Sequence, residues 1–308
     1  MSVHRLLLAC ALVSLPLASL LPAQAQEGDG PVLVITAGAR DYLFGAGGTL
    51  ARMIGQGREV YVLQFGNLEK DSAGSGPAQT SLLNNAEART ATELLGVKEV
   101  LNLGHKSGEL AYISSSEMRN QVMTMVRFYK PETMFFPDWY VHYVDDQDIY
   151  RVGRMAEESP YGGGNYFLQE MTHIGLTGYA AKFYYFYAPY RPYRPGEGGE
   201  GHAGFKVVDI GSTFDRKVRA ALALRGANHR YAMETKQRLE LAARPSALLN
   251  PLDDLAVDKL IRAYLEELAA TIGAKHGQHY AEEFNFLGSY PPIPAHVLER
   301  ARPVQPAR

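Results

Sequence analysis

Two short runs of polar residues could do chemistry. Arg40-Asp41-Tyr42 closely follows an apolar segment at 31–36, and His142 to Asp148 carries an imidazole and three carboxylates within seven residues. Carboxylates and imidazoles bind divalent cations, and a guanidinium pairs with carboxylate or phosphate through two parallel hydrogen bonds. The runs therefore predict either a metal site built from Asp41 and the second run, or an anion site at Arg40. A local Arg40–Asp41 ion pair and a solvated Asp-rich turn are the plainer interpretations.

Other chemistries are poorly supported. Cys10 is the single cysteine and precedes the mature protein predicted below, which excludes disulfides, thiolate catalysis and cysteine zinc sites there. The glycines from Gly45 to Gly48 suggest a dinucleotide fingerprint, but Leu50 stands where its third glycine belongs and no acidic residue ends the second apolar run. We find no Gly-x-Ser-x-Gly motif of a serine hydrolase.

The elements that must position these residues alternate regularly. Continuous apolar runs are typical of strands buried on both faces of a parallel sheet, and helix-like stretches lie between them. The predicted strands are 31–36, 59–65, 99–103 and 133–136, and the predicted helices are 49–56, 82–95 and 116–129. Further on we expect strands at 181–187 and 205–210, a loop at 189–204, and helices at 212–242 and 253–272. The pattern predicts an α/β fold with a mainly parallel sheet and C-terminal helices.

Composition restricts location and partners. The formal net charge is −2 and charged residues make up 21%, so we expect no bulk attraction to nucleic acid. Leu6 to Leu21 is apolar and precedes Ala23-Gln24-Ala25, which predicts a signal peptide at 1–25 and a periplasmic or secreted single domain at 26–308. Pro16 and the shortness of the apolar run argue against stable membrane insertion. The sequence does not indicate the oligomeric state.

The stretch from Val32 to Gly48 resembles the first motif of the LmbE/PIG-L family of zinc-dependent N-acetylglucosaminyl deacetylases. In that family a strand ends in Ala-His-Pro-Asp-Asp-Glu, and Gly-Gly follows after four further residues. Ala37, Asp41, Gly45, Gly47 and Gly48 match without a gap, and later similarities stay in register at Glu87, Ala91, 95–97, 103–104, 152–154 and 280–284. The resemblance covers nearly the whole mature chain and implies a Rossmann-like three-layer sandwich.

The resemblance also implies where the chemistry is altered. The family holds zinc with His, Asp and His, beside a carboxylate that acts as the general base. By position, Gly38 and Ile149 replace the two histidine ligands, Arg40 replaces the base, and only Asp41 survives as a ligand. Asp146 replaces a further histidine. Three further changes are Tyr42 for the motif's closing Glu, Ser107 for a family Asp and Asn84 for a family Arg. The losses fall on polar site positions while scaffold positions stay.

These departures predict an altered or non-catalytic member, with no zinc and no catalytic residue expected. We expect a carbohydrate or related small ligand to bind at Arg40, Asp41, Tyr42, His142, Asp146 and Asp148. One alternative is a working metal-dependent hydrolase that deacetylates N-acetylated sugars with a metal held by Asp41 and the His142 to Asp148 run. Another is a structural or partner-binding subunit that presents 184–194 as an aromatic and basic surface.

Overall fold

The sheet carries the architecture. The computed structural model describes residues 28–72, 74–139, 146–159, 163, 167–189, 204–287 and 295–300, so the expected signal peptide at 1–25 lies outside them. The strands are β1 (Val32–Thr36), β2 (Val60–Gly66), β3 (Glu99–His105), β4 (Thr133–Pro137), β5 (Phe183–Tyr187), β6 (Gly204–Asp209) and β7 (Ala281–Leu287). They form one sheet in the order β3-β2-β1-β4-β5-β7-β6, in which β7 runs in the opposite direction to the other six strands. The predicted α/β class with a mainly parallel sheet is confirmed.

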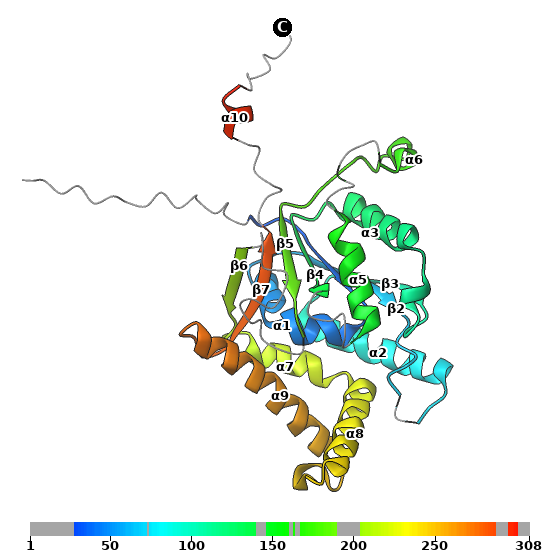
Figure 1. Cartoon of the computed structure of the whole chain (residues 1–308), viewed down its shortest axis with the longest axis vertical. Helices are drawn as coiled ribbons and strands as arrows, with labels where there is room; N and C mark the ends of the chain where they lie inside the picture. The colour runs from blue at the N-terminus through cyan, green and yellow to red at the C-terminus, as the bar shows by residue number, and fades with distance from the viewer. Residues whose placement is uncertain are drawn as a thin grey trace, which may run out of the picture.

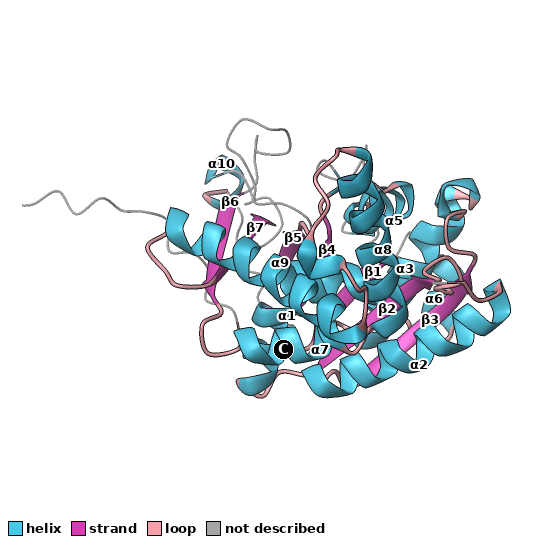
Figure 2. Ribbon diagram, turned by 90° about the horizontal axis from the view of Figure 1, so that it is seen from below, coloured by secondary structure: helices cyan, strands magenta, loops and turns pink. Residues whose placement is uncertain are grey.

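Helices cover both faces of the sheet (Figure 1). They are α1 (Ala39–Gly55), α2 (Pro77–Leu95), α3 (Ser115–Tyr129), α5 (Gln147–Glu157), α6 (Gln169–His173), α7 (Phe214–Leu222), α8 (Arg225–Leu241), α9 (Asp254–Lys275) and α10 (Ala295–Leu298), with 3-10 turns η1 (Leu110–Tyr112) and η3 (Ala247–Leu249). Figure 2 shows α1, α2 and α7 on one side of the strands and α3 with α5 on the other. No helix among these described segments is long and apolar enough to cross a membrane.

Alternate residues of β1 enter two different cores. Val32 and Val34 pack with α1, α2, α7 and α9, whereas Leu33 and Ile35 pack with α3 and α5. Successive side chains of a strand point to opposite faces, so a strand between two helical layers must be apolar throughout. This requirement explains the continuous apolar runs in the sequence.

Two predicted helix boundaries were wrong. The first helix begins at Ala39, ten residues before the predicted start at 49, and so includes Gly45, Gly47 and Gly48. A Cβ at Gly45 would lie 2.9 Å from Tyr187 and one at Gly48 would lie 2.8 Å from Ile210, so the glycines permit close packing inside a helix. The single helix predicted at 212–242 is two helices, α7 and α8, separated at 223–224.

A buried ion pair joins α1 to two distant elements. Lys217 of α7 lies 2.7 Å from the Glu282 carboxylate of β7, and both side chains are almost fully buried. The Lys217 ammonium also donates to the Phe44 carbonyl at 2.6 Å, and Glu282 accepts from the amides of Gly48 at 2.9 Å and Thr49 at 2.8 Å. These contacts supply partners to backbone groups of α1 from outside the helix, and they satisfy both buried charges.

We expect Lys217→Met to lower the free energy of unfolding by about 3–5 kcal/mol, because it leaves Glu282 as a buried charge without its cation. Urea denaturation followed by circular dichroism measures the change. As a matched control, Arg262→Met removes the exposed pair with Asp215 and should cost no more than about 0.5 kcal/mol. Equal effects of the two substitutions would contradict a special role for the buried pair.

Candidate functional site

The turn from β1 into α1 is held by Asp41. One carboxylate oxygen, Oδ2, accepts from the Thr36 hydroxyl at 2.8 Å, the Ala37 amide at 3.0 Å and the Gly38 amide at 3.1 Å. Gly38 is the N-cap residue of α1, so Asp41 supplies an acceptor to amides that the helix itself cannot satisfy. Asp41, which the resemblance places at a family ligand position, therefore stabilises the turn in this structure.

Burial dominates the electrostatics of Asp41. Removal from water raises the pKa of this carboxyl to about 7 from an ordinary 3.8, and the negative charge of Asp146 adds to the increase. The hydrogen bonds from Gly38 and Thr36 act in the opposite direction because they favour the ionised form. The turn is thus held by a carboxylate that titrates near neutral pH.

Arg40 lies against aromatic rings. Its guanidinium carbon is 4.6 Å from the ring centre of Phe44 on α1 and 4.3 Å from that of Tyr231 on α8. Burial raises the pKa of Asp71, and the positive charges of Arg230 and Arg40 oppose that increase. The charged group that acts on the pKa of Asp41 is Asp146. The guanidinium is positioned between two helices and close to Asp71.

Tyr42 is part of the core. Its side chain is fully buried, and among the described residues its hydroxyl has no hydrogen-bond partner. Burial and the nearby charge of Asp41 raise the pKa of Tyr42 well above its ordinary value, so the phenol stays protonated at physiological pH.

A small cavity adjoins Arg40 and Asp41 at the carboxyl edge of the sheet. Its volume is about 40 Å³, close to the space of one water molecule. The lining residues come from the start of α1, the loop after β2, α2, and the region around the start of α8: Gly38, Ala39, Arg40, Asp41, Leu68, Asp71, Asn84, Glu87, Leu224 and Ala227.

Three polar residues of this lining were absent from the predicted site. Asp71 pairs with Arg230 of α8 at 3.1 Å, and burial raises the pKa of its carboxyl. Asn84 donates to the carbonyls of Leu68 at 2.9 Å and Asp71 at 2.8 Å, and Glu87 accepts from the Gly226 amide at 2.8 Å. The position of Asp71 in a polar loop after the second strand is a signal that could have identified it, because loops after parallel strands share one edge.

The acidic residues at the start of α5 also have structural partners. Asp146 caps α5 by accepting from the amides of Asp148 at 2.9 Å and Ile149 at 3.0 Å. Asp148 accepts from the amides of Gly108 and Leu110 in and before η1. Ile149 is buried in the core beneath α5, and His142 lies outside the described residues.

The donor set on these elements does not fit a zinc ion. Zinc sites need three or four nitrogen, sulfur or oxygen ligands. Gly38, Asp41 and Ile149, which the resemblance places at the family's ligand positions, offer one carboxylate among them. The carboxylate already accepts three hydrogen bonds on one oxygen. In the described part of the chain, no three His, Cys, Asp or Glu side chains are grouped to hold a metal.

Comparison with known proteins agrees with the resemblance in the sequence. Residues 33–156 match the family model described as PIG-L: GlcNAc-PI de-N-acetylase. The N,N'-diacetylchitobiose deacetylase from Pyrococcus horikoshii is 22% identical, with a TM-score of 0.66 over 87% of this chain and 88% of that chain. The conserved protein TT1542 from Thermus thermophilus is 21% identical, with a TM-score of 0.58 over 86% and 96% of the two chains.

A third similar structure has a different activity. GalB, the 4-carboxy-2-hydroxymuconate hydratase from Pseudomonas putida, is 17% identical, with a TM-score of 0.59 over 86% of this chain and 98% of that chain. The TM-scores of these three structures show a shared fold, and at identities below 25% they show the fold alone. A deacetylase and a hydratase therefore share it, so the reaction must be argued from the site.

The raised pKa of Asp41 gives a test of the site's electrostatics. Between the ordinary pKa of 3.8 and about 7, the folded state holds a proton that the unfolded chain has lost, so Asp41's contribution to stability falls as the pH rises. Between pH 4 and pH 7.5, we expect the free energy of unfolding of the wild type to fall by up to about 4 kcal/mol relative to that of Asp41→Asn. Urea denaturation of both proteins across this range measures the difference. A relative gain would show that the three hydrogen-bond donors outweigh burial.

Proposed function

We propose that this protein, which matches the PIG-L family over residues 33–156, is a member without zinc-dependent hydrolysis that binds a carbohydrate or related ligand at the former active-site edge. The observation that carries the proposal is the use of Asp41. In a zinc deacetylase a carboxylate at this position needs an oxygen directed at the metal. Here one oxygen of Asp41, Oδ2, accepts from the Thr36 hydroxyl and from the amides of Ala37 and Gly38, and neither Gly38 nor Ile149 can complete a coordination shell.

The polar groups around the cavity support ligand binding. Arg40 provides donors, and Asp71 and Glu87 provide acceptors, in a cavity with room for one small group. Sugar hydroxyls both donate and accept hydrogen bonds, so such a mixed lining suits a hydroxyl or acylamino substituent. The sugar ring itself would rest at the mouth of the cavity, since the volume of about 40 Å³ is too small to enclose it.

The purified wild-type protein should therefore bind N,N'-diacetylchitobiose without releasing acetate. Calorimetric titration measures binding, and an acetate assay with added Zn²⁺ measures turnover. Arg40→Ala should weaken binding about tenfold, because a charge-assisted hydrogen bond is lost. The matched control Arg52→Ala alters an arginine on the same helix that contacts the Asp209 carbonyl, and it should leave affinity unchanged. Stoichiometric zinc with acetate release would instead establish a working hydrolase with a rearranged site.

Restoring the family residues gives an independent test. The variant Gly38→His, Arg40→Asp, Tyr42→Glu, Ile149→His should bind zinc with micromolar affinity or better. A Cβ at Gly38 would lie 3.6 Å from Asp41 Oδ1 and 3.0 Å from Leu68, so a histidine there starts next to the surviving carboxylate and needs only a small shift of a flexible side chain. Elemental analysis of the folded variant measures zinc.

The control for restoration keeps Ile149 and changes the other three residues. It lacks the third ligand and should bind zinc at least tenfold more weakly. If the full variant folds, as judged by circular dichroism, and still binds no zinc, the assignment of Ile149 to the third ligand position is wrong.

A further inference from the structure

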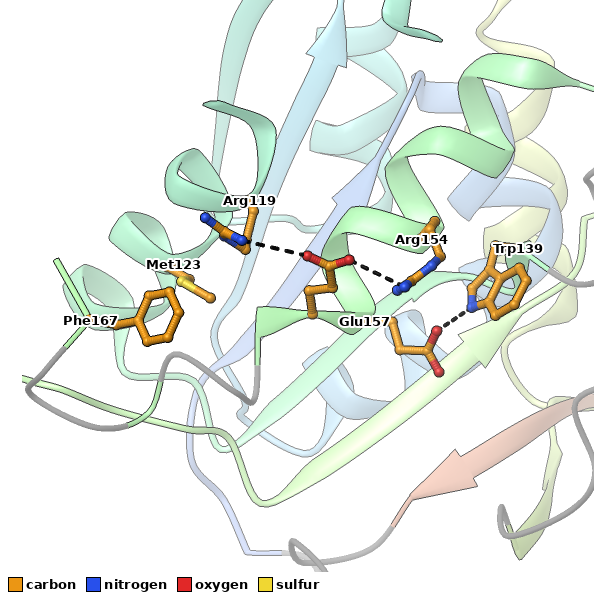
Figure 3. Close-up of a pocket in the computed structure, with 7 residues that line it drawn as sticks. Arg119, Met123, Trp139, Arg154, Glu157 and Phe167 are labelled. Atoms are coloured by element: carbon orange, nitrogen blue, oxygen red, sulfur yellow. Dashed lines mark hydrogen bonds and ion pairs between the residues drawn. The ribbon is translucent and has the colours of Figure 1, made fainter. Parts of the chain in front are cut away.

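A second, larger pocket lies beside α3 and α5 (Figure 3). Its volume is about 380 Å³, within the range of about 300–1,000 Å³ usual for small-molecule sites. It is lined by Arg119 and Met123 of α3, Arg154 and Glu157 of α5, Glu158, Trp139 after β4, and Phe167 before α6. Among the described residues it shares no lining with the cavity at Arg40, which opens on the α1, α2 and α8 side of the sheet.

Two arginines in this pocket have unused donors. Arg119 lies 3.9 Å and Arg154 lies 3.3 Å from the carboxylate of Glu158, and neither donates a hydrogen bond to any other described side chain or carbonyl. The Arg119 Nε is buried and has no partner within the described part of the chain. A buried donor without a partner is costly, so an acceptor group of a bound ligand would be stabilising at this position.

Each of the two guanidinium groups lies near an aromatic ring. The Arg119 carbon lies 5.6 Å from the ring centre of Phe167, and the Arg154 carbon lies 5.6 Å from that of Trp139. At these cation–π distances the N–H groups at the edge of each guanidinium remain able to reach acceptors. Figure 3 shows Arg119 and Arg154 on opposite sides of one carboxylate, that of Glu158, to which dashed lines join them.

The pocket also presents acceptors. Glu157 accepts from the Trp139 indole N–H through one oxygen, and Glu158 is shared between the two arginines. Burial raises the pKa of the Glu157 carboxyl, while the Trp139 hydrogen bond and the charge of Arg154 oppose the increase. Two guanidiniums and two carboxylates sum to no net charge, so the pocket has no bulk preference for an anion or a cation.

We propose that this pocket is a second binding site, which takes a neutral, hydroxyl-rich ligand of one or two sugar rings. Charged donors and acceptors lie beside the apolar surfaces of Met123, Trp139 and Phe167, and a sugar has both hydroxyl groups and apolar C–H faces. The site does not depend on the proposed function at the Arg40 cavity, because different elements build it.

The chain itself provides the probe, since Trp139 is its only tryptophan. Titration with N,N'-diacetylchitobiose should give a saturable change in tryptophan emission. Arg119→Ala should raise the dissociation constant at least about tenfold, because it removes the unpartnered donors. Arg119→Lys, which keeps the charge but not the planar fork, should also raise it. Arg40→Ala alters only the other cavity and should leave the emission titration unchanged.

Each other outcome overturns the inference. A sugar site here would be excluded if the sugar caused no change in tryptophan emission and calorimetry detected no binding that depends on Arg119. Binding of glucuronate at least tenfold tighter than the neutral sugar would make the pocket an anion site. An emission change that Arg40→Ala abolishes and Arg119→Ala leaves intact would place the ligand at the Arg40 cavity alone.

Discussion

Glu282 reaches from β7 into the middle of α1, and this contact fixes the position of the helix on which the site depends. The carboxylate accepts from two amides of α1, and Lys217 of α7 neutralises it while donating to a carbonyl of the same helix. An unpaired charge in this core would cost several kcal/mol, so the three elements must meet in one arrangement. The glycines of α1 allow this arrangement, because a side chain at Gly48 would collide with Ile210. The start of α1, where Asp41 and Arg40 lie, is placed by contacts two turns further along the helix.

At the site, acidic side chains that could take part in chemistry serve the backbone instead. Asp41 holds the β1–α1 turn, Asp146 caps α5, and Asp148 holds the amides at η1. Such interactions stabilise the shape of this edge of the sheet without a bound metal. The same carboxylates supply the helix caps and turns that the fold requires, whether or not a metal is held. Retention of an acidic residue is therefore weak evidence for retained catalysis.

Much of the fold could be predicted from the sequence, because strands buried on both faces of a sheet must be continuous apolar runs. The start of α1 could not be predicted, since glycine disfavours a helix in the local sequence. The glycines are required only by close contacts with Tyr187 and Ile210. At the site, Arg40 and Asp41 could be identified from their position after the first strand. The Asp71–Arg230 pair joins residues far apart in the chain, and no local pattern encodes it. The pocket at Trp139 was missed for the same reason, because its lining comes from four separate segments.

The position of β7 in the sheet restricts the order in which the chain can fold. This strand begins at Ala281, close to the C-terminal end of the described residues, yet it lies between β5 and β6 and is the sheet partner of β6. During synthesis, β6 therefore has no strand to join until residues 281–287 have emerged. The Lys217 ammonium likewise has no carboxylate partner in this ion pair until Glu282 has been synthesised. Insertion of β7 between β5 and β6 is thus a late, long-range step of folding. A chain truncated before residue 281 would expose an unpaired strand edge that favours aggregation.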